Sequence, residues 1–171
     1  MALVDSEYAG EFAVLATWVA GLLPWSVSLL RTGQFTVVAI RFLPVRAQYI
    51  FGAGFGPLER PFLWTWDVPG FLHGSGTGTA WLRAGAWLAV AALAVYLVAL
   101  AASVAFYVAE DRLTGLPVHP VRFLGASLLA VGLLVTVAGL LFLRYRTGVG
   151  LPVGGPITVA LAYPLLRVPL E

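Results

Sequence analysis

Long apolar stretches without charged residues alternate with short polar segments along this chain, and they predict membrane-spanning helices. The stretches at residues 12–30, 84–109 and 123–143 contain no Asp, Glu, Lys or Arg. The shortest of them gives a helix of about 28 Å, close to the ~30 Å thickness of a bilayer's hydrocarbon core. We therefore expect a span in each range, with a kink at Pro24 in the first.

A fourth apolar stretch, residues 152–169, is less regular, because Gly154, Gly155 and Pro156 lie near its start and Pro164 near its end. We expect either a fourth span or a re-entrant or interfacial tail. The predicted fold class is thus an all-α, multi-span transmembrane helical bundle with three or four spans, forming a single integral membrane domain over the chain.

The connection between the first two spans, residues 31–83, lacks the polar period of a soluble domain. It contains a β-rich run at residues 35–42, several Pro and Gly residues, and Trp64, Trp66 and Trp81. Tryptophan is enriched at the depth of the lipid headgroups. We expect this connection to lie on the membrane surface or to re-enter the membrane.

Composition favours a membrane protein and argues against other classes. Apolar residues make up 60% of the chain and charged residues only 11%, which is far from the balance of a soluble domain. The ten basic residues are all Arg and are spread along the chain, so no nucleic-acid partner is indicated. Because the chain has no Cys, thiolate metal sites are excluded. We predict no metal and no cofactor.

The distribution of Arg predicts the orientation in the membrane. The 31–83 connection carries five Arg, and Arg144 and Arg146 follow the third span. The opposite side holds Arg112, Arg122 and, if a fourth span exists, Arg167. Since cytoplasmic loops are rich in Lys and Arg, we predict a multi-pass protein of the cell membrane with its N-terminus outside.

Candidate catalytic residues follow the second span. Glu110 and Asp111 end this span and His119 lies shortly after it. Carboxylates and an imidazole at the membrane surface are able to bind a metal or to act as acid and base. The alternative, which we favour, is a hydrated helix end, so no catalytic residue is assigned.

Two further groups of residues have candidate roles in binding and packing. Arg41, Arg46 and Arg60 are candidate contacts for anionic lipid headgroups, although a role in orientation explains them equally well. Small residues on the second and third spans predict close helix packing, within the chain or against another subunit; they are Gly85, Ala89, Ala92, Gly125, Gly132 and Gly139. Serines in the spans are interpreted as hydrogen-bonding or packing residues between helices; they are Ser26, Ser28, Ser103 and Ser127.

One segment resembles a known family. The sequence Gly-Leu-Leu-Pro-Trp-Ser-Val at residues 21–27, followed by Phe-Thr-Val at 35–37, is similar to the opening of a family of small, uncharacterised multi-pass membrane proteins of haloarchaea. The Arg-only, Ala- and Gly-rich composition is similar as well. This resemblance implies a membrane location and a high-salt host, and it implies no activity.

Three functions remain open at this point. The favoured hypothesis is a non-enzymatic accessory or structural subunit of a larger membrane complex, whose partners are the lipid bilayer and either another membrane protein or a second copy of the chain. The first alternative is an enzyme acting on a lipid or lipid-linked substrate. The second alternative is a small transporter or channel, for which broken helices are the supporting feature.

Overall fold

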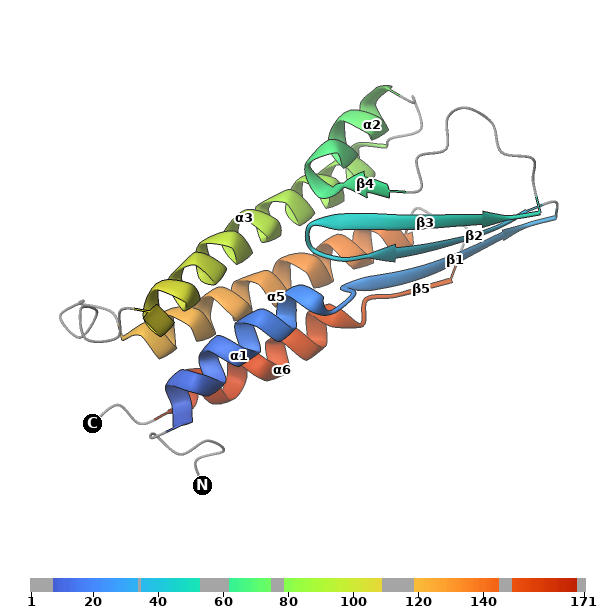
Figure 1. The fold of residues 1–171 in the computed structure, drawn as a ribbon. Coiled ribbons are helices and arrows are strands. Elements are labelled where there is room, and N and C mark those ends of the chain that lie inside the picture. The colour runs from blue at the N-terminus through green and yellow to red at the C-terminus, as the bar shows by residue number, and fades with distance from the viewer. Residues whose placement is uncertain are drawn as a thin grey trace.

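The computed structural model describes residues 8–33, 35–52, 62–74, 79–108, 119–144 and 149–168. Its helices form a bundle, and an antiparallel sheet projects from one end of that bundle (Figure 1). The helices are α1 (Ala9–Leu22), α2 (Val68–Gly74), α3 (Ala80–Val108), α5 (Pro120–Arg144) and α6 (Gly154–Arg167), with a short 3-10 helix η2 (Thr65–Asp67) before α2. The strands are β1 (Ser26–Thr32), β2 (Phe35–Arg41), β3 (Val45–Phe51), β4 (Phe62–Trp64) and β5 (Val149–Leu151).

The predicted all-α fold class is therefore wrong. Within the described residues, the five strands form one antiparallel sheet in the order β4-β3-β2-β1-β5. Two of the helices, α3 and α5, are long and apolar enough to cross a membrane. The predicted interfacial or re-entrant connection, residues 31–83, instead supplies β2, β3 and β4, the end of β1, η2, α2 and the first turn of α3.

The predicted first span, residues 12–30, is split between a helix and a strand. Helix α1 ends at Leu22, and β1 begins at Ser26. Pro24 explains the break, because its ring disfavours helical backbone at Leu23 and its nitrogen has no hydrogen to donate. With 14 residues, α1 is about 21 Å long, which is shorter than the hydrocarbon core.

The other three predicted spans do contain helices. Helix α3 covers most of residues 84–109, and α5 covers residues 123–143. Thr79 stabilises the start of α3 by accepting a hydrogen bond at its Oγ1 from the Leu82 amide, 3.4 Å away, as a capping residue does. Pro120 occupies the first position of α5, which suits its fixed φ. Helix α6, within residues 152–169, has only 14 residues.

Helix α5 is the centre of the bundle, since it packs against α3, α6 and α1. Its core side chains are Leu124, Leu128, Val131 and Val135. The facing surface of α3 is made mostly of small residues, including Gly85, Ala86, Ala89, Ala92 and Ala99. Small residues let the helix backbones approach closely.

Hydrogen bonds join the sheet to the bundle where α1 ends and α6 begins. The Trp25 amide donates to the Arg41 carbonyl at 2.8 Å, and the Gly154 amide donates to the Trp25 carbonyl at 3.3 Å. The Trp25 ring is buried, and its Nε1 donates to the Phe42 carbonyl at 3.0 Å. These bonds join the base of the sheet to the start of α6.

Candidate functional site

The side of the sheet that faces the helices carries polar and charged residues. Strand register places Ser26 opposite Arg41, and Arg41 opposite Arg46, so the three lie in one row across β1, β2 and β3. Directly paired residues of an antiparallel sheet share a face. Ser28 and Gln48 belong to the same face, because both pair with Ala39.

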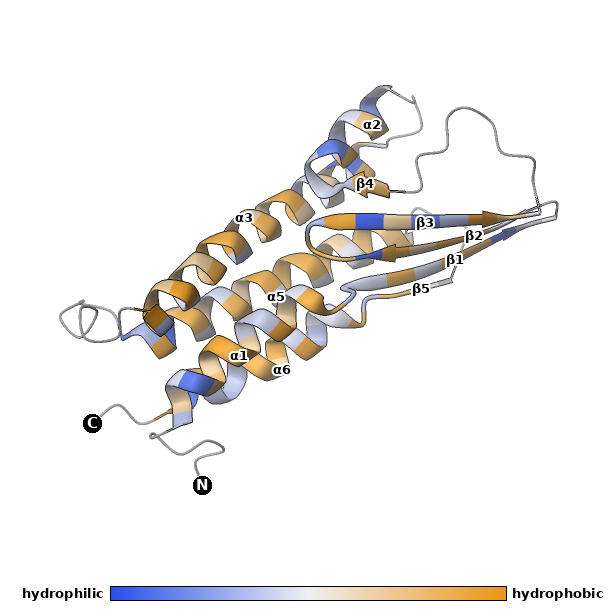
Figure 2. Ribbon diagram, in the orientation of Figure 1, coloured by the Kyte–Doolittle hydropathy of each residue, from blue (hydrophilic) through white to orange (hydrophobic). Residues whose placement is uncertain are grey.

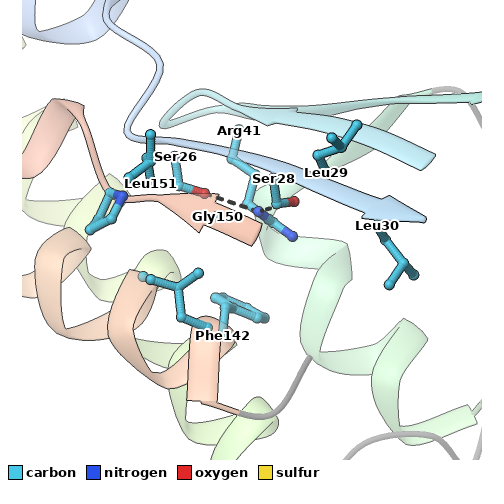
Figure 3. Close-up of a pocket in the computed structure, with 11 residues that line it drawn as sticks. Ser26, Ser28, Leu29, Leu30, Arg41, Phe142, Gly150 and Leu151 are labelled. Atoms are coloured by element: carbon cyan, nitrogen blue, oxygen red, sulfur yellow. Dashed lines mark hydrogen bonds between the residues drawn. The ribbon is translucent and has the colours of Figure 1, made fainter. Parts of the chain in front are cut away.

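Arg41 lies inside the protein, between this face and α5. Its side chain is 5% exposed, and its Nη1 donates to Ser26 Oγ at 2.9 Å and to Ser28 Oγ at 3.1 Å (Figure 3). The guanidinium carbon lies 5.1 Å from the ring centroid of Phe142 and 5.9 Å from that of Trp25. Contacts of this kind between a cation and an aromatic ring are attractive.

Arg46 is the second buried arginine of the row, at 7% exposure. Its Nη2 donates to Gln48 Oε1. Two like charges directly opposite each other repel, and burial removes much of the water that would screen them. The hydroxyl, amide and aromatic groups around the two guanidinium groups offset part of this cost.

A partly open cavity adjoins Arg41. Its volume is about 20 Å³, which exceeds the ~10–15 Å³ that one water molecule needs. Polar atoms come from Arg41, Ser26 and Ser28. Apolar atoms come from α5, β1, β5 and the segment that follows β5; the lining residues are Leu29, Leu30, Gly139, Phe142, Leu143, Gly150, Leu151 and Pro152.

The opposite side of the sheet carries exposed apolar residues, whereas the usual arrangement of a sheet places its apolar residues inward. Large apolar or aromatic side chains with substantial exposure lie on every strand except β2; they are Val27, Leu29, Tyr49, Phe51, Phe62, Trp64 and Leu151. We call these seven residues the outer sheet face. Figure 2 shows hydrophilic segments that interrupt the otherwise hydrophobic strands.

The structure places the sequence-predicted site residues in different regions. Arg41 and Arg46 are buried under the sheet instead of lying on the surface, while Arg60, Glu110 and Asp111 lie outside the described residues. His119 is exposed just before α5. Among the described residues, no group of three or more His, Cys, Asp or Glu is placed to hold a metal ion.

The small residues singled out in the sequence are all buried. An added Cβ on Gly125 or Gly132 would meet α6, and one on Gly139 would meet Pro152. A Cβ on Gly85 would meet α5, whereas Ala89 and Ala92 are already buried. These residues therefore set how closely α3, α5 and α6 pack.

Sequence reasoning missed the roles of Ser26, Ser28 and Gln48. The two serines bond Arg41 across strands, and they do not join helices. A signal was present, because Ser26 and Ser28 alternate with Val27 and Leu29 as in a strand with one polar side. Ser103 does join helices, since it accepts a hydrogen bond from Trp18 Nε1 at 3.2 Å.

Comparison with known proteins places the chain in a family. Residues 2–170 match a family of unknown function (DUF7549), and the protein belongs to that family. No curated protein and no solved structure matches the chain.

Proposed function

We propose that this protein is an integral membrane protein in which α3 and α5 cross the bilayer, and that it serves as a non-enzymatic subunit of a larger membrane complex. The observation that carries the proposal is an inverted distribution of side-chain size. Small residues make up most of the buried faces of α1 and α3, and large apolar residues cover the outside of these helices. Such a surface suits lipid and would promote aggregation in water.

Helix α3 illustrates this distribution. It is apolar on all sides, which is typical of a helix in a core or in a membrane. Only 33% of its most apolar stretch, and 44% of that of α5, is buried within the protein, whereas the core helix of a soluble protein is mostly buried. The outward side chains of α3 include Trp87, Leu97, Val98 and Val104.

Aromatic and charged residues mark the two ends of the proposed membrane region. Trp81 and Tyr107 are both exposed and lie about 39 Å apart along α3, which matches a ~30 Å hydrocarbon core with part of both headgroup layers. Arg83 lies near the first of these residues and Arg122 near the start of α5. Figure 2 shows mainly hydrophobic helix between those ends.

Hydroxyl groups within the bundle bond to their own helices. Thr17 donates to the Ala13 carbonyl at 2.8 Å, and Thr158 donates to the Gly154 carbonyl at 2.8 Å. Thr136 makes the same bond to its own helix. Polar groups in lipid need such internal partners, because the hydrocarbon offers no water.

The outer sheet face supports the subunit role. Strands β1, β2 and β3 reach beyond the end of α5 (Figure 1), so lipid tails that surround the bundle do not cover the whole of this face. An exposed apolar surface of this kind is typical of an interaction site. The edge strands β4 and β5 have three residues each, which disfavours pairing at the edges. We infer that another membrane protein packs on the outer sheet face.

The resemblance of residues 21–37 to small multi-pass membrane proteins of haloarchaea supports the same location, and we extend the proposal to a host that lives in high salt.

The test is purification of the tagged full chain from its own membranes in a mild detergent, followed by sizing and mass spectrometry. We expect the protein in the membrane fraction with a partner in fixed stoichiometry. The double variant Leu29→Ala and Leu151→Ala on the outer sheet face should lose that partner. The matched control, the double variant Leu133→Ala and Leu140→Ala on the exposed side of α5, removes the same atoms and should retain it.

Two results contradict the proposal. Recovery of the protein in the soluble fraction would refute the membrane location. A membrane protein that purifies alone would refute the subunit role, and a species containing only copies of this chain would replace the heterologous partner with self-association.

A further inference from the structure

We propose that an exposed aromatic surface beside the base of the sheet binds the lipid bilayer, at the boundary between its headgroups and its acyl chains. We call this surface the aromatic corner; it consists of Trp64 at the end of β4, Trp66 in η2 and Phe71 in α2. The proposal rests on the proposed membrane location of α3 and α5, and it adds a lipid contact made outside those two helices. Trp64 also belongs to the outer sheet face, so the bilayer covers the end of that face nearest the bundle and leaves the rest to the partner protein.

The two tryptophans of the corner stack on each other and still expose much of their surface. Their ring centroids lie 5.0 Å apart, with an angle of 6° between the ring planes, and each side chain is 52% exposed. Phe71 is 46% exposed. An indole ring combines a large apolar body with one N–H donor, which is why Trp collects where lipid meets water. The corner therefore has the side chains that suit this boundary.

Folded structure holds the corner in place beside α3. The Thr65 amide donates to the Pro44 carbonyl at 3.0 Å, and Thr65 Oγ1 donates to the Leu43 carbonyl at 2.7 Å, so η2 is bonded to the turn between β2 and β3. Helix α2 packs on α3, and Arg83 Nη1 donates to His73 Nδ1 at 3.3 Å. The depth of the corner in a membrane is thus set by the depth of α3.

The residues of α3 beside the corner give that depth. Thr65, which lies between the two tryptophans in sequence, lines one small cavity together with Ala86 and Ala89. The ~39 Å between Trp81 and Tyr107 exceeds the ~30 Å hydrocarbon core by about 9 Å, so roughly 4–5 Å at each end lies among headgroups. Ala86 is about 7.5 Å along the helix from Trp81, which places it about 3 Å inside the hydrocarbon. The tryptophans that flank Thr65 therefore lie close to the boundary.

The charged groups near the corner are arranged as in a membrane interface. Arg83 is about 4.5 Å nearer the start of α3 than Ala86, and it contacts the exposed His73 on the headgroup side. A cation at this level is attracted to anionic lipid phosphates. Asp67, next to Trp66, is exposed as well, and the headgroup layer hydrates a carboxylate as the hydrocarbon does not. This order of rings and charges favours a lipid surface as the occupant.

The experiment uses single-cysteine variants of the purified full chain, each carrying a nitroxide spin label, in nanodiscs of dioleoylphosphatidylglycerol. The chain has no native Cys, so each label has one position. The measurement is the ratio of label collisions with oxygen, which concentrates in hydrocarbon, to collisions with a nickel chelate, which stays in water. The ratio is high in lipid and low in water, and a site covered by protein is reached by neither reagent.

Three labels separate the corner from the rest of the protein. The corner label is on Gly70→Cys, because Gly70 precedes Phe71 and lies one helical turn after Trp66. The sheet label is on Gly33→Cys at the far end of the sheet. It is the matched control, since both glycines are exposed and an added Cβ meets nothing within 4 Å at either. The span label is on Leu97→Cys, on the exposed side of α3, and it tests the membrane location itself.

We expect the ratio at the corner label to be several-fold higher than at the sheet label and lower than at the span label. Replacing both tryptophans, Trp64→Ser with Trp66→Ser, should lower the ratio at the corner label toward that of the sheet label. The matched control, Tyr49→Ser with Phe51→Ser, also removes two exposed aromatic rings from the protein. It should leave the ratio at the corner label unchanged.

Three results would overturn the proposal. A corner label with the ratio of the sheet label would place the corner in water. A corner label that neither reagent reaches would assign the corner to a contact with a second copy of the chain. An unchanged ratio after loss of the two tryptophans would show that they do not hold the corner in the bilayer. In each case a high ratio at the span label leaves the membrane location intact, whereas a low ratio there refutes that location separately.

Discussion

Replacement of Gly154 by Ala should destabilise the protein strongly, although it adds a single methyl group. A Cβ at this position would lie 2.6 Å from Trp25 Cα and 2.7 Å from the Pro24 carbonyl oxygen. Ordinary contacts begin at 3.4 Å, so α6 and the segment before β1 would have to separate by roughly 0.7–0.8 Å. Both neighbours are backbone atoms and no side-chain rotation relieves the clash. Overpacking of this kind costs about 1–3 kcal/mol, and we expect the upper end.

The assay is thermal unfolding in detergent, followed by circular dichroism or by the amount of protein that remains monodisperse. A loss of ~3 kcal/mol corresponds to a fall of about 6–12 °C in Tm for a chain of this size. Gly70→Ala is the control, because Gly70 is also helical and a Cβ there would meet nothing within 4 Å. A Gly154→Ala variant that unfolds at the same temperature as Gly70→Ala would refute the close contact between α6 and the start of β1.

Two further predictions concern the bundle and its junction with the sheet. Ala92→Leu, at a fully buried position of α3, should lower the free energy of unfolding by about 1–3 kcal/mol. Leu97→Ala, on the exposed side of the same helix, should change it by less than about 0.5 kcal/mol. If thermal unfolding gave the larger loss for Leu97→Ala, the inverted size distribution would be contradicted. Trp25→Phe removes the hydrogen bond to the Phe42 carbonyl and should lower the free energy of unfolding by about 1–3 kcal/mol. The same unfolding assay measures this change, and an unchanged Tm would show that the bond does not hold the junction.

The long helices could be predicted from the sequence because charged residues delimit them. Arg83 precedes the second apolar stretch, and Arg122 and Arg144 enclose the third. In the stretch at residues 12–30, no charged residue separates the helix from the strand that follows it. Hydropathy alone does not distinguish an apolar helix from an apolar strand. Pro24 was interpreted as a kink, and it instead separates α1 from β1.

The sheet could not be predicted from its apolar content, because its polar side faces inward. Charged residues usually lie at a surface, so the sequence makes Arg41 and Arg46 candidate contacts for lipid headgroups, with a role in orientation as an equal alternative. Their burial depends on the register of β1, β2 and β3 and on aromatic residues far away in sequence, such as Phe142. Local patterns do not contain that information, although the Ser26 and Ser28 alternation does indicate a strand.

The most direct test of the membrane proposal is labelling of two single-cysteine variants with an impermeant maleimide, since the chain has no native Cys. Gly33→Cys lies at the far end of the sheet, and His119→Cys lies at the start of α5; both positions are exposed. We predict that His119→Cys is labelled in intact cells and Gly33→Cys only after permeabilisation, because the Arg-rich end should be cytoplasmic. Labelling of Gly33→Cys alone would reverse the orientation, and equal labelling of the two variants in intact cells, or of neither, would contradict a membrane-spanning protein.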